Sequence, residues 1–179
     1  MNDTRLFFDL LVAMTTRELR ARYKHTFFGF IWIIANPLLQ MIVIGFIFTF
    51  LLAQPVKNYY SFLFNGLLVW NFFSLSLAKT TPSIVYERSL IKKARFPHAV
   101  IPASIILSNF IHFFLAFILY LVSVLFLGTL SWLSVPLVLL SFLLLLTFTV
   151  GLSLLTASLN VRFRDVNFFV SAILIIWFY

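Results

Sequence analysis

Long apolar runs alternate along this chain with three short patches of basic residues. The patches cover residues 5–24, 79–95 and 162–164 and hold twelve of the 13 lysines and arginines, leaving only Lys57 outside them. A helix needs about 20 apolar residues to cross a bilayer, and the cytosolic connections of membrane proteins retain Lys and Arg. The pattern therefore predicts a multi-pass membrane protein whose basic connections share the cytosolic side.

The composition agrees with a membrane protein rather than a soluble one. Hydrophobic residues make up 63% of the chain and charged residues 10%, whereas soluble domains carry about 25% charged residues. The first 24 residues mix acids and bases with apolar residues and do not resemble a signal peptide, so we expect a cytosolic N-terminus. The 179 residues leave room for about five crossings and no soluble domain. We predict a single all-α transmembrane domain, residues 1–179.

Residues 4–24 have the pattern of an amphipathic helix. The apolar positions recur at helical spacing and are Leu6, Leu10, Leu11 and Met14. The basic positions that follow share one face and are Arg17, Arg20 and Lys24. Such a helix lies along the membrane interface, and Thr4 or Asp3 is the expected N-cap. The pattern leaves open whether this helix is a simple anchor or docks a partner.

Five apolar stretches are predicted membrane spans, at residues 26–53, 59–79, 99–127, 132–159 and 166–179. Pro37, after Asn36, removes a backbone hydrogen bond from the first span and predicts a bend near mid-membrane. Asp165 is the expected N-cap of the last span. That span has only 14 residues, about 21 Å of helix and too short to cross. We therefore expect an incomplete span and a natural protein that continues beyond Tyr179.

Polar side chains inside the spans predict faces that contact other helices. The second span carries Asn65, Gly66, Asn71, Ser74 and Ser76. The third places Ser104, Ser108 and His112 on one stripe, with Asn109 beside it. An intramembrane histidine is a functional candidate, although we favour a hydrogen bond to a neighbouring helix as the explanation of His112. The fourth carries Thr149, Ser153 and Ala157 at four-residue intervals, a pattern typical of close helix packing.

Motifs for catalysis and for nucleotide or metal binding are absent from the sequence. No G-x-x-x-x-G-K-[ST] occurs, so the chain lacks the usual loop that holds nucleotide phosphates. The three histidines are far apart, and cysteine is missing. The acids all lie outside the spans and are Asp3, Asp9, Glu18, Glu87 and Asp165. The sequence therefore predicts neither an enzyme nor a cofactor bound by this chain, and its basic patches do not indicate a nucleic-acid partner.

The connection at residues 80–98 combines basic residues with an apolar face. After Pro82, the apolar positions suit a short amphipathic helix and are Ile84, Val85, Tyr86, Leu90 and Ile91. Pro97 would end or restart that helix. The apolar face fits docking into a groove of a soluble subunit, and it also fits a segment that lies on anionic lipid.

Three runs of the sequence resemble a known family. They are RARYKHTFFGFIWIIANPLL, LIKKARFPHAVIPAS and LNVRFRDV, and they are spread over most of the chain. They resemble the ABC-2 type permeases, the type V exporter-like proteins that export lipid-linked polysaccharides such as O-antigen, capsule or teichoic acid. The order of interfacial helix, two-span hairpin, charged inner loop and further spans is similar as well.

The resemblance implies a six-helix permease in the bacterial inner (cytoplasmic) membrane, of which about five helices are present here. It implies a homodimer with two copies of a separate subunit that binds ATP and Mg. The inner loop would couple to that ATPase through Tyr86, Glu87, Arg88, Lys92, Lys93 and Arg95. Aromatic channel-lining candidates would be Phe27, Phe28, Phe30, Trp32, Phe168, Phe169, Trp177 and Tyr179.

Other functions remain open at the level of sequence. The same architecture would serve an ABC-2 exporter of a small molecule or a lipo-oligosaccharide. A membrane-embedded glycan-processing enzyme would need catalytic residues beyond Tyr179. A passive membrane scaffold would leave the intramembrane polar stripes unexplained.

Overall fold

In a computed structural model, the protein is described at residues 3–24, 29–51, 59–93, 96–126 and 135–179. These residues form helices and connections without a strand, as the all-α prediction required. The long helices are α1 (Asp3–Tyr23), α2 (Trp32–Leu51), α3 (Tyr59–Thr80), α6 (Val100–Phe126), α7 (Val135–Arg162) and α8 (Asp165–Phe178). The short ones are the 3₁₀ helix η1 (Gly29–Ile31), α4 (Ser83–Tyr86) and α5 (Arg88–Lys93).

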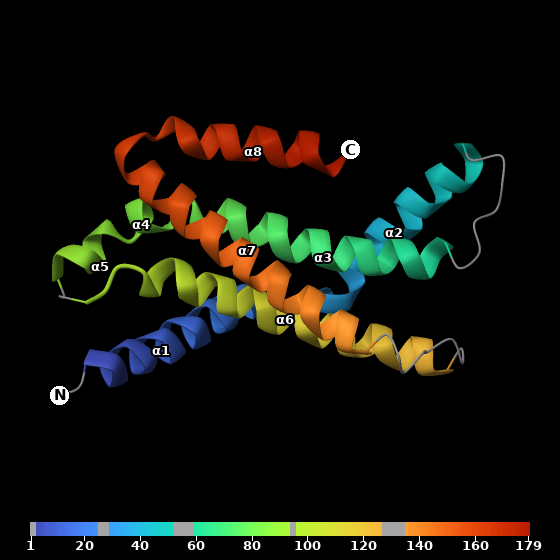
Figure 1. The fold of residues 1–179 in the computed structure, drawn as a ribbon, viewed down its shortest axis with the longest axis horizontal. Coiled ribbons are helices and arrows are strands. Elements are labelled where there is room, and N and C mark those ends of the chain that lie inside the picture. Colours follow the sequence, from blue (N-terminus) through green and yellow to red (C-terminus); the bar gives the residue numbers. More distant parts are fainter. Residues whose placement is uncertain (1–2, 25–28, 52–58, 94–95, 127–134) are drawn as a thin grey trace.

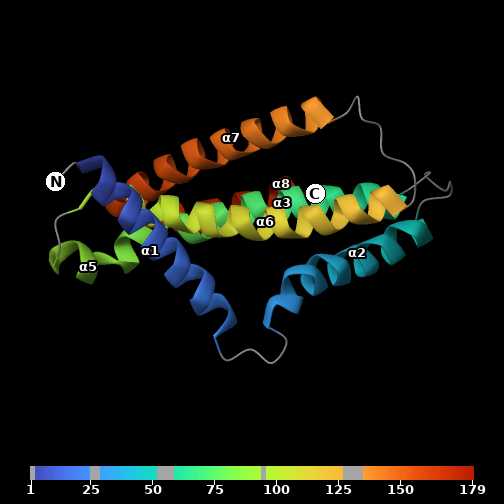
Figure 2. The same cartoon turned by 90° about the horizontal axis from the view of Figure 1, so that it is seen from below.

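Four of the described helices are long and apolar enough to cross a membrane, namely α2, α3, α6 and α7. The apolar helix α8 has 14 residues. In both views of the fold, the start of α1, the short helices α4 and α5, and the turn between α7 and α8 lie at the same end of the molecule (Figures 1 and 2). The chain therefore gathers segments of all three basic patches at one end, as expected if they share one side of a membrane.

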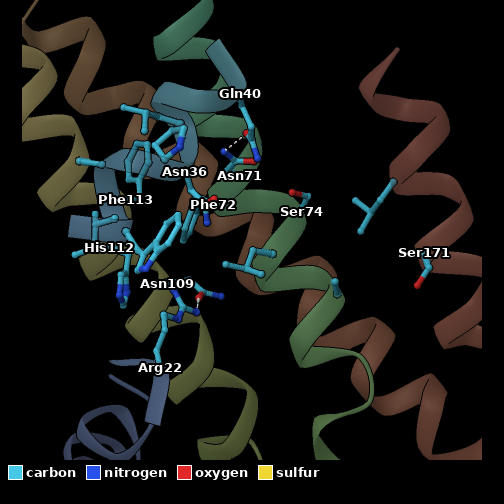
Figure 3. A pocket seen from close by; sticks show the side chains of 18 residues that line it. Arg22, Asn36, Gln40, Asn71, Phe72, Ser74, Asn109, His112, Phe113 and Ser171 are labelled. Atoms are coloured by element: carbon cyan, nitrogen blue, oxygen red, sulfur yellow. Dashed lines mark hydrogen bonds between the residues drawn. The ribbon is translucent and has the colours of Figure 1, made fainter. Parts of the chain in front are cut away.

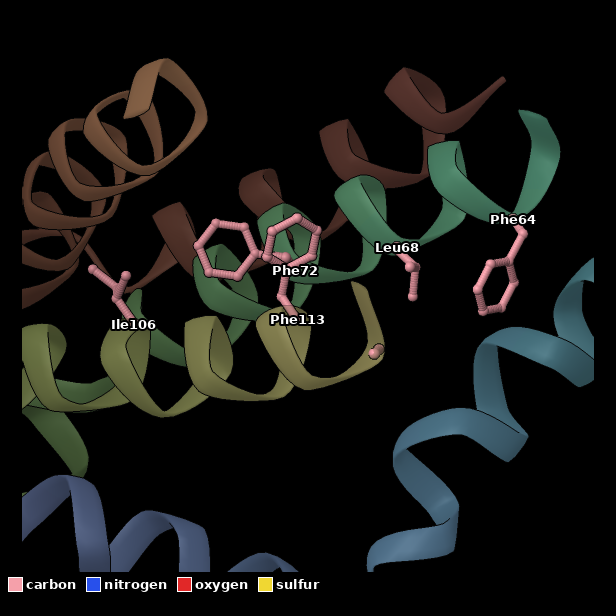
Figure 4. Packing of buried hydrophobic residues seen from close by; sticks show 6 residues of the cluster. Phe64, Leu68, Phe72, Ile106 and Phe113 are labelled. Carbon is pink, nitrogen blue, oxygen red and sulfur yellow. The ribbon is translucent and has the colours of Figure 1, made fainter. Parts of the chain in front are cut away.

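The centre of the bundle is the contact between α3 and α6. Buried Phe64, Leu68 and Phe72 of α3 meet Ile106, Phe113 and Ala116 of α6 (Figure 4). The ring centroids of Phe72 and Phe113 lie 5.4 Å apart, within the range of favourable aromatic pairs. Because lipid is as apolar as these side chains, close packing and not escape from water holds such a contact together.

Helix α7 packs on α3 through small residues. Thr149, Ser153 and Ala157 are fully buried, which confirms the predicted packing face. At one end of this contact, Thr81 Oγ1 donates a hydrogen bond of 3.1 Å to Thr156 Oγ1. Small side chains let two helix backbones come close, so a narrow stripe is sufficient to hold a long helix.

Helix α2 lies against α3 and is preceded by η1. Gly29 has φ +48°, a conformation that glycine adopts at little cost. Pro37 lies within α2, in its second turn, and the bend predicted there near mid-membrane stays a prediction. Further along, Gly45 is buried beneath the ring of Tyr60, whose Cε1 would lie 2.5 Å from a Cβ at position 45. Any larger residue there would have to displace that ring.

Helix α8 begins at Asp165, and its N-cap position is occupied by Arg164. The prediction that Asp165 caps this helix is therefore wrong, and Arg164 makes no side-chain cap hydrogen bond. As a first-turn residue, Asp165 still places a negative charge near the positive end of the helix dipole. Thr4 and Asp3, predicted as alternatives for the N-cap of α1, both lie within that helix, which begins at Asp3, so that prediction is wrong as well.

Candidate functional site

Helix α1 packs its apolar face against the rest of the protein. Met14 is buried with Val100 and Ile101 at the start of α6. The partly buried residues around this cluster are Phe7, Leu10, Leu11, Leu90, Ile91 and Phe96. The amphipathic helix was predicted correctly. Much of its apolar face contacts protein rather than lipid. The helix crosses the bundle obliquely (Figure 2). Arg17 and Arg20 of this helix are exposed, as is Lys24 directly after it.

The segment after Pro82 forms the helices α4 and α5, with Glu87 between them. Leu90 and Ile91 of α5 face the Met14 cluster, so packing within the chain accounts for these two apolar residues. Of the predicted coupling residues in this segment, the side chains left exposed are Tyr86, Arg88, Lys92 and Lys93. Arg95 lies outside the described residues. A partner that approaches this segment would thus meet one aromatic ring among three cations.

An ion pair joins this segment to α1. The guanidinium of Arg17 donates to the carboxylate of Glu87, and Arg17 also lies 3.6 Å from the Glu18 carboxylate. Both partners of the Arg17–Glu87 pair are partly exposed, at 49% and 29%. Such exposed pairs contribute little to stability. The pair links the residue between α4 and α5 to α1.

Three helices meet at Asn109, which is 2% exposed. Arg22 of α1 donates to Asn109 Oδ1. Asn109 Nδ2 in turn donates to Ser76 Oγ of α3 over 3.1 Å. Ser76 of the second span and Asn109 of the third thus face protein, where an interhelical hydrogen bond joins them.

His112 lies one turn beyond Ser108 on the same buried stripe of α6. Its Nδ1 lies 2.7 Å from the Ser108 carbonyl oxygen. Because a carbonyl can only accept, Nδ1 must carry the proton and donate. This hydrogen bond stays within α6 rather than reaching a neighbouring helix. His112 also lines the cavity described next, so a functional role remains compatible with its position.

A cavity of about 690 Å³ opens between α2, α3 and α6, with α8 on its far side and the end of α1 below (Figure 3). Its polar lining residues are Arg22, Asn36, Gln40, Asn71, Ser74, Asn109, His112 and Ser171. Within it, Asn71 Nδ2 donates to Gln40 Oε1 over 2.8 Å. Apolar residues such as Leu68, Phe72 and Phe113 form the rest of the wall. A cavity of this size suits a ligand of drug-like dimensions.

The structure brings only part of the predicted aromatic lining to this cavity. Trp32 at the start of α2 lines it. The four aromatic candidates of α8 are exposed and do not, and they are Phe168, Phe169, Trp177 and Tyr179. Phe27 and Phe28 lie outside the described residues, and the side chain of Phe30 is likewise not described. The aromatic channel stays a prediction.

Sequence reasoning singled out neither Arg22 nor Gln40. Arg22 follows Thr15, a buried residue, by seven positions, so both lie on the same face of α1. That spacing distinguishes Arg22 from the exposed Arg20. Gln40 follows Asn36 by four positions and shares its face of α2. Asn36 and Gln40, two polar residues four positions apart in an otherwise apolar helix, could therefore have indicated a polar face on α2.

Four helices that are long and apolar enough to cross a membrane, around a partly polar cavity, define the general class of polytopic membrane proteins. Residues 9–179 match the family model of the ABC-2 type transporters. The chain belongs to this ABC-2 type transporter family.

Two relatives make the likeness more specific. The chain is 39% identical over 170 residues to the O-antigen export system permease protein RfbA of Myxococcus xanthus, covering 95% of this chain and 65% of the relative. It is 37% identical over 177 residues to the protein of the same name from Klebsiella pneumoniae, covering 96% of this chain and 67% of that relative. The chain thus spans about two thirds of the length of these relatives.

Proposed function

We propose that this protein is the permease subunit of an ATP-driven ABC exporter that moves lipid-linked polysaccharide outward across the bacterial inner membrane. The observation that carries the proposal is the 39% identity to an O-antigen export permease over 95% of the chain. The basic end would face the cytosol. Two copies of a separate subunit would bind ATP and Mg, and two copies of this chain would form the pathway.

The ATPase would dock on the outer side of α4 and α5. The exposed Tyr86, Arg88, Lys92 and Lys93 support this, because aromatic and basic residues are frequent anchors of interfaces. Leu90 and Ile91 pack against the cluster around Met14 of α1, and Arg17 of α1 pairs with Glu87. A movement of this segment would therefore also move α1. Arg95, Arg20 and Lys24 are further candidates for the same cytosolic surface.

The exported chain would pass along the aromatic residues at the start of the α2 region and on α8. The exposed position of Phe168, Phe169, Trp177 and Tyr179 supports this, because much of each side chain is left uncovered by this chain. The other candidates are Phe27, Phe28, Phe30 and Trp32. Aromatic faces suit the apolar faces of sugar rings.

Purification of the tagged protein from its own cells tests the class of transporter. We expect a stoichiometric ATP-binding subunit to follow it, and depletion of the protein should make lipid-linked polysaccharide accumulate on the cytosolic side. Accumulation of a small molecule, with polysaccharide export intact, would instead favour a small-molecule exporter. Purification without any ATPase would contradict the proposal altogether.

A pair of variants tests the docking surface. Lys92→Gln combined with Lys93→Gln should lower both ATPase co-purification and export, because two exposed cations leave the surface. Arg5→Gln combined with Arg164→Gln is the matched control, since it removes two exposed cations outside this segment. Equal co-purification in both double variants would exclude the docking surface and leave the exporter proposal standing.

A further inference from the structure

The buried hydroxyl groups between α7 and the end of α3 bond mostly within their own helices. On α7, Thr149 Oγ1 donates to the Leu145 carbonyl oxygen over 2.7 Å, and Thr156 Oγ1 donates to the Ser153 carbonyl oxygen over 3.2 Å. Hydrogen bonds of this kind stay within one helix and move with it. They therefore do not resist movement of α7 along α3.

Thr81, directly after α3, makes a contact that crosses to α7. Its Oγ1 lies 2.7 Å from the Leu77 carbonyl oxygen and 3.1 Å from Thr156 Oγ1. A hydroxyl group has one proton to donate, so the two acceptors share it and Thr156 takes the longer of the two bonds. Exchange of Thr156 for another acceptor would therefore cost little.

Asn160 lies one turn beyond Thr156 on the same face of α7, about 6 Å further along the helix. It is 3% exposed, and its Oδ1 atom has no hydrogen-bond partner among the described residues. A carboxamide oxygen can only accept, and the backbone N–H groups this far along a helix are bonded within it. A donor for Asn160 must therefore come from another element.

The packing of α7 repeats at the same interval of one turn. Thr149, Ser153 and Ala157 are fully buried and lie four residues apart. If α7 moves by one turn away from the end that gathers the basic patches, Ala157 takes the place of Ser153, and Ser153 that of Thr149. Because all three residues are small, the two helices can stay in close contact after this movement.

The contact between α6 and α7 offers a matching step. The Phe142 ring of α7 lies 5.1 Å from the Phe113 ring and 4.6 Å from the Phe117 ring, centroid to centroid. Helices α6 and α7 run in opposite directions (Figure 1), so the same movement takes Phe142 from Phe113 toward Tyr120. Phe117 and Tyr120 lie 5.7 Å apart, close to the 6.0 Å between Phe113 and Phe117. Phe142 would therefore again lie between two rings.

We propose that α7 has a second register on α3, one helical turn from the one described, in which Thr81 donates to Asn160 in place of Thr156. The unpaired Asn160 oxygen, the repeated small residues and the rings of α6 all fit this single displacement. One-turn shifts between packed helices can act as switches. Thr81 lies two residues before α4, so a movement of α4 would change the register. The proposal does not depend on which substrate is exported.

Cysteine cross-linking in membranes from cells that express the protein tests the two registers. The chain contains no cysteine, and a disulfide needs Cα atoms within about 7 Å. Thr81→Cys with Thr156→Cys reports the described register, and Thr81→Cys with Asn160→Cys reports the second. Both pairs should form a disulfide at least about tenfold faster than Thr81→Cys with Ser158→Cys, because Ser158 is on the exposed face of α7.

A substitution at Asn160 gives an independent test. Asn160→Leu removes the acceptor of the second register and keeps a similar volume. Combined with Thr81→Cys and Thr156→Cys, it should speed their disulfide by about twofold or more, because the population of the second register returns to the described one. Ser158→Leu is the control and should leave the rate unchanged. Asn160→Ala, with the same expected increase, serves if Asn160→Leu does not reach the membrane.

The proposal is overturned if Thr81→Cys with Asn160→Cys forms a disulfide no faster than the pair with Ser158→Cys, while the pair with Thr156→Cys does. It is also overturned if removal of the Asn160 acceptor leaves the rate of the Thr81→Cys, Thr156→Cys pair unchanged. Either result would mean that α7 has a single register on α3.

Discussion

Helices α6 and α7 are nearly equal in length and hydropathy, yet the protein uses them differently. Their apolar windows have mean hydropathies of 2.3 and 2.5, but 44% of the α6 window is buried and only 11% of the α7 window. Helix α6 buries large rings and a polar stripe, whereas the buried residues of α7 are small or polar. Hydropathy thus predicts that a segment crosses the membrane, whereas side-chain size and polarity decide which face meets protein.

The largest expected effect is the loss of a ring from the buried side of α6. Phe113 is 4% exposed, and its ring lies 5.4 Å from Phe72 and 5.1 Å from Phe142. Phe113→Ala should lower the free energy of unfolding by about 3 kcal/mol, because a cavity remains. The measurement is a thermal unfolding midpoint in one detergent. Phe114→Ala, whose side chain is 47% exposed, should change the midpoint little; equal losses would contradict the assigned faces.

Helix α7 should respond to added bulk instead. Ser153 is fully buried on the small-residue face. Ser153→Leu should destabilise the protein by about 2 kcal/mol, because the larger side chain separates α7 from α3. Ser158→Leu places the same residue on the exposed face of α7 and should be nearly neutral. A midpoint for Ser153→Leu that matches the Ser158→Leu value would show that α7 is not held by this stripe.

The polar contact of α6 should have a smaller, measurable effect. A double-mutant cycle of Asn109→Ala and Arg22→Gln isolates the energy of the hydrogen bond between these side chains. We expect a coupling of about 1 kcal/mol, since interhelical hydrogen bonds in membranes contribute modestly and one partner is charged. Chemical unfolding of the four proteins in the cycle gives the value. Additive effects would mean that Arg22 and Asn109 act independently.

The smallest effect is expected on the outer face of α7. Leu143 is 61% exposed, and a lipid or detergent chain replaces its contacts after truncation. Leu143→Ala should shift the free energy of unfolding by less than about 0.5 kcal/mol. The same thermal assay checks this. A loss similar to that of Phe113→Ala would indicate that another part of the assembly covers this face.

The sequence predicted the helical class and several packing faces, because polar or small residues stand out within apolar spans. Ser108 and Asn109 on α6, and Ser153 on α7, are buried as their spacing indicated. It did not predict that α1 packs on α6, or that Leu90 and Ile91 join the same cluster. An apolar face has the same pattern whether it contacts lipid or protein, so periodicity alone cannot distinguish the two.

The candidate site was predictable only in part, because tertiary contacts decide which residues reach the cavity. Trp32 lines the cavity as one of the expected aromatic residues, whereas the α8 aromatics do not reach it. Arg20 and Arg22 are identical side chains two positions apart, and only the docking of α1 turns one outward and the other toward Asn109. Tertiary contacts therefore decide which basic residue has a place in the site.

The close approach of Tyr60 to the buried Gly45 would let α2 tilt about this point as a lever. The helix is held against α3 near Gly45 and borders the cavity at Trp32. Thirteen residues separate these points, a lever arm of about 20 Å. With Gly45 as fulcrum, a tilt of about 10° would displace the Trp32 end by about 3 Å. We expect a small tilt of α2 to change the width of the cavity without unfolding any helical turn.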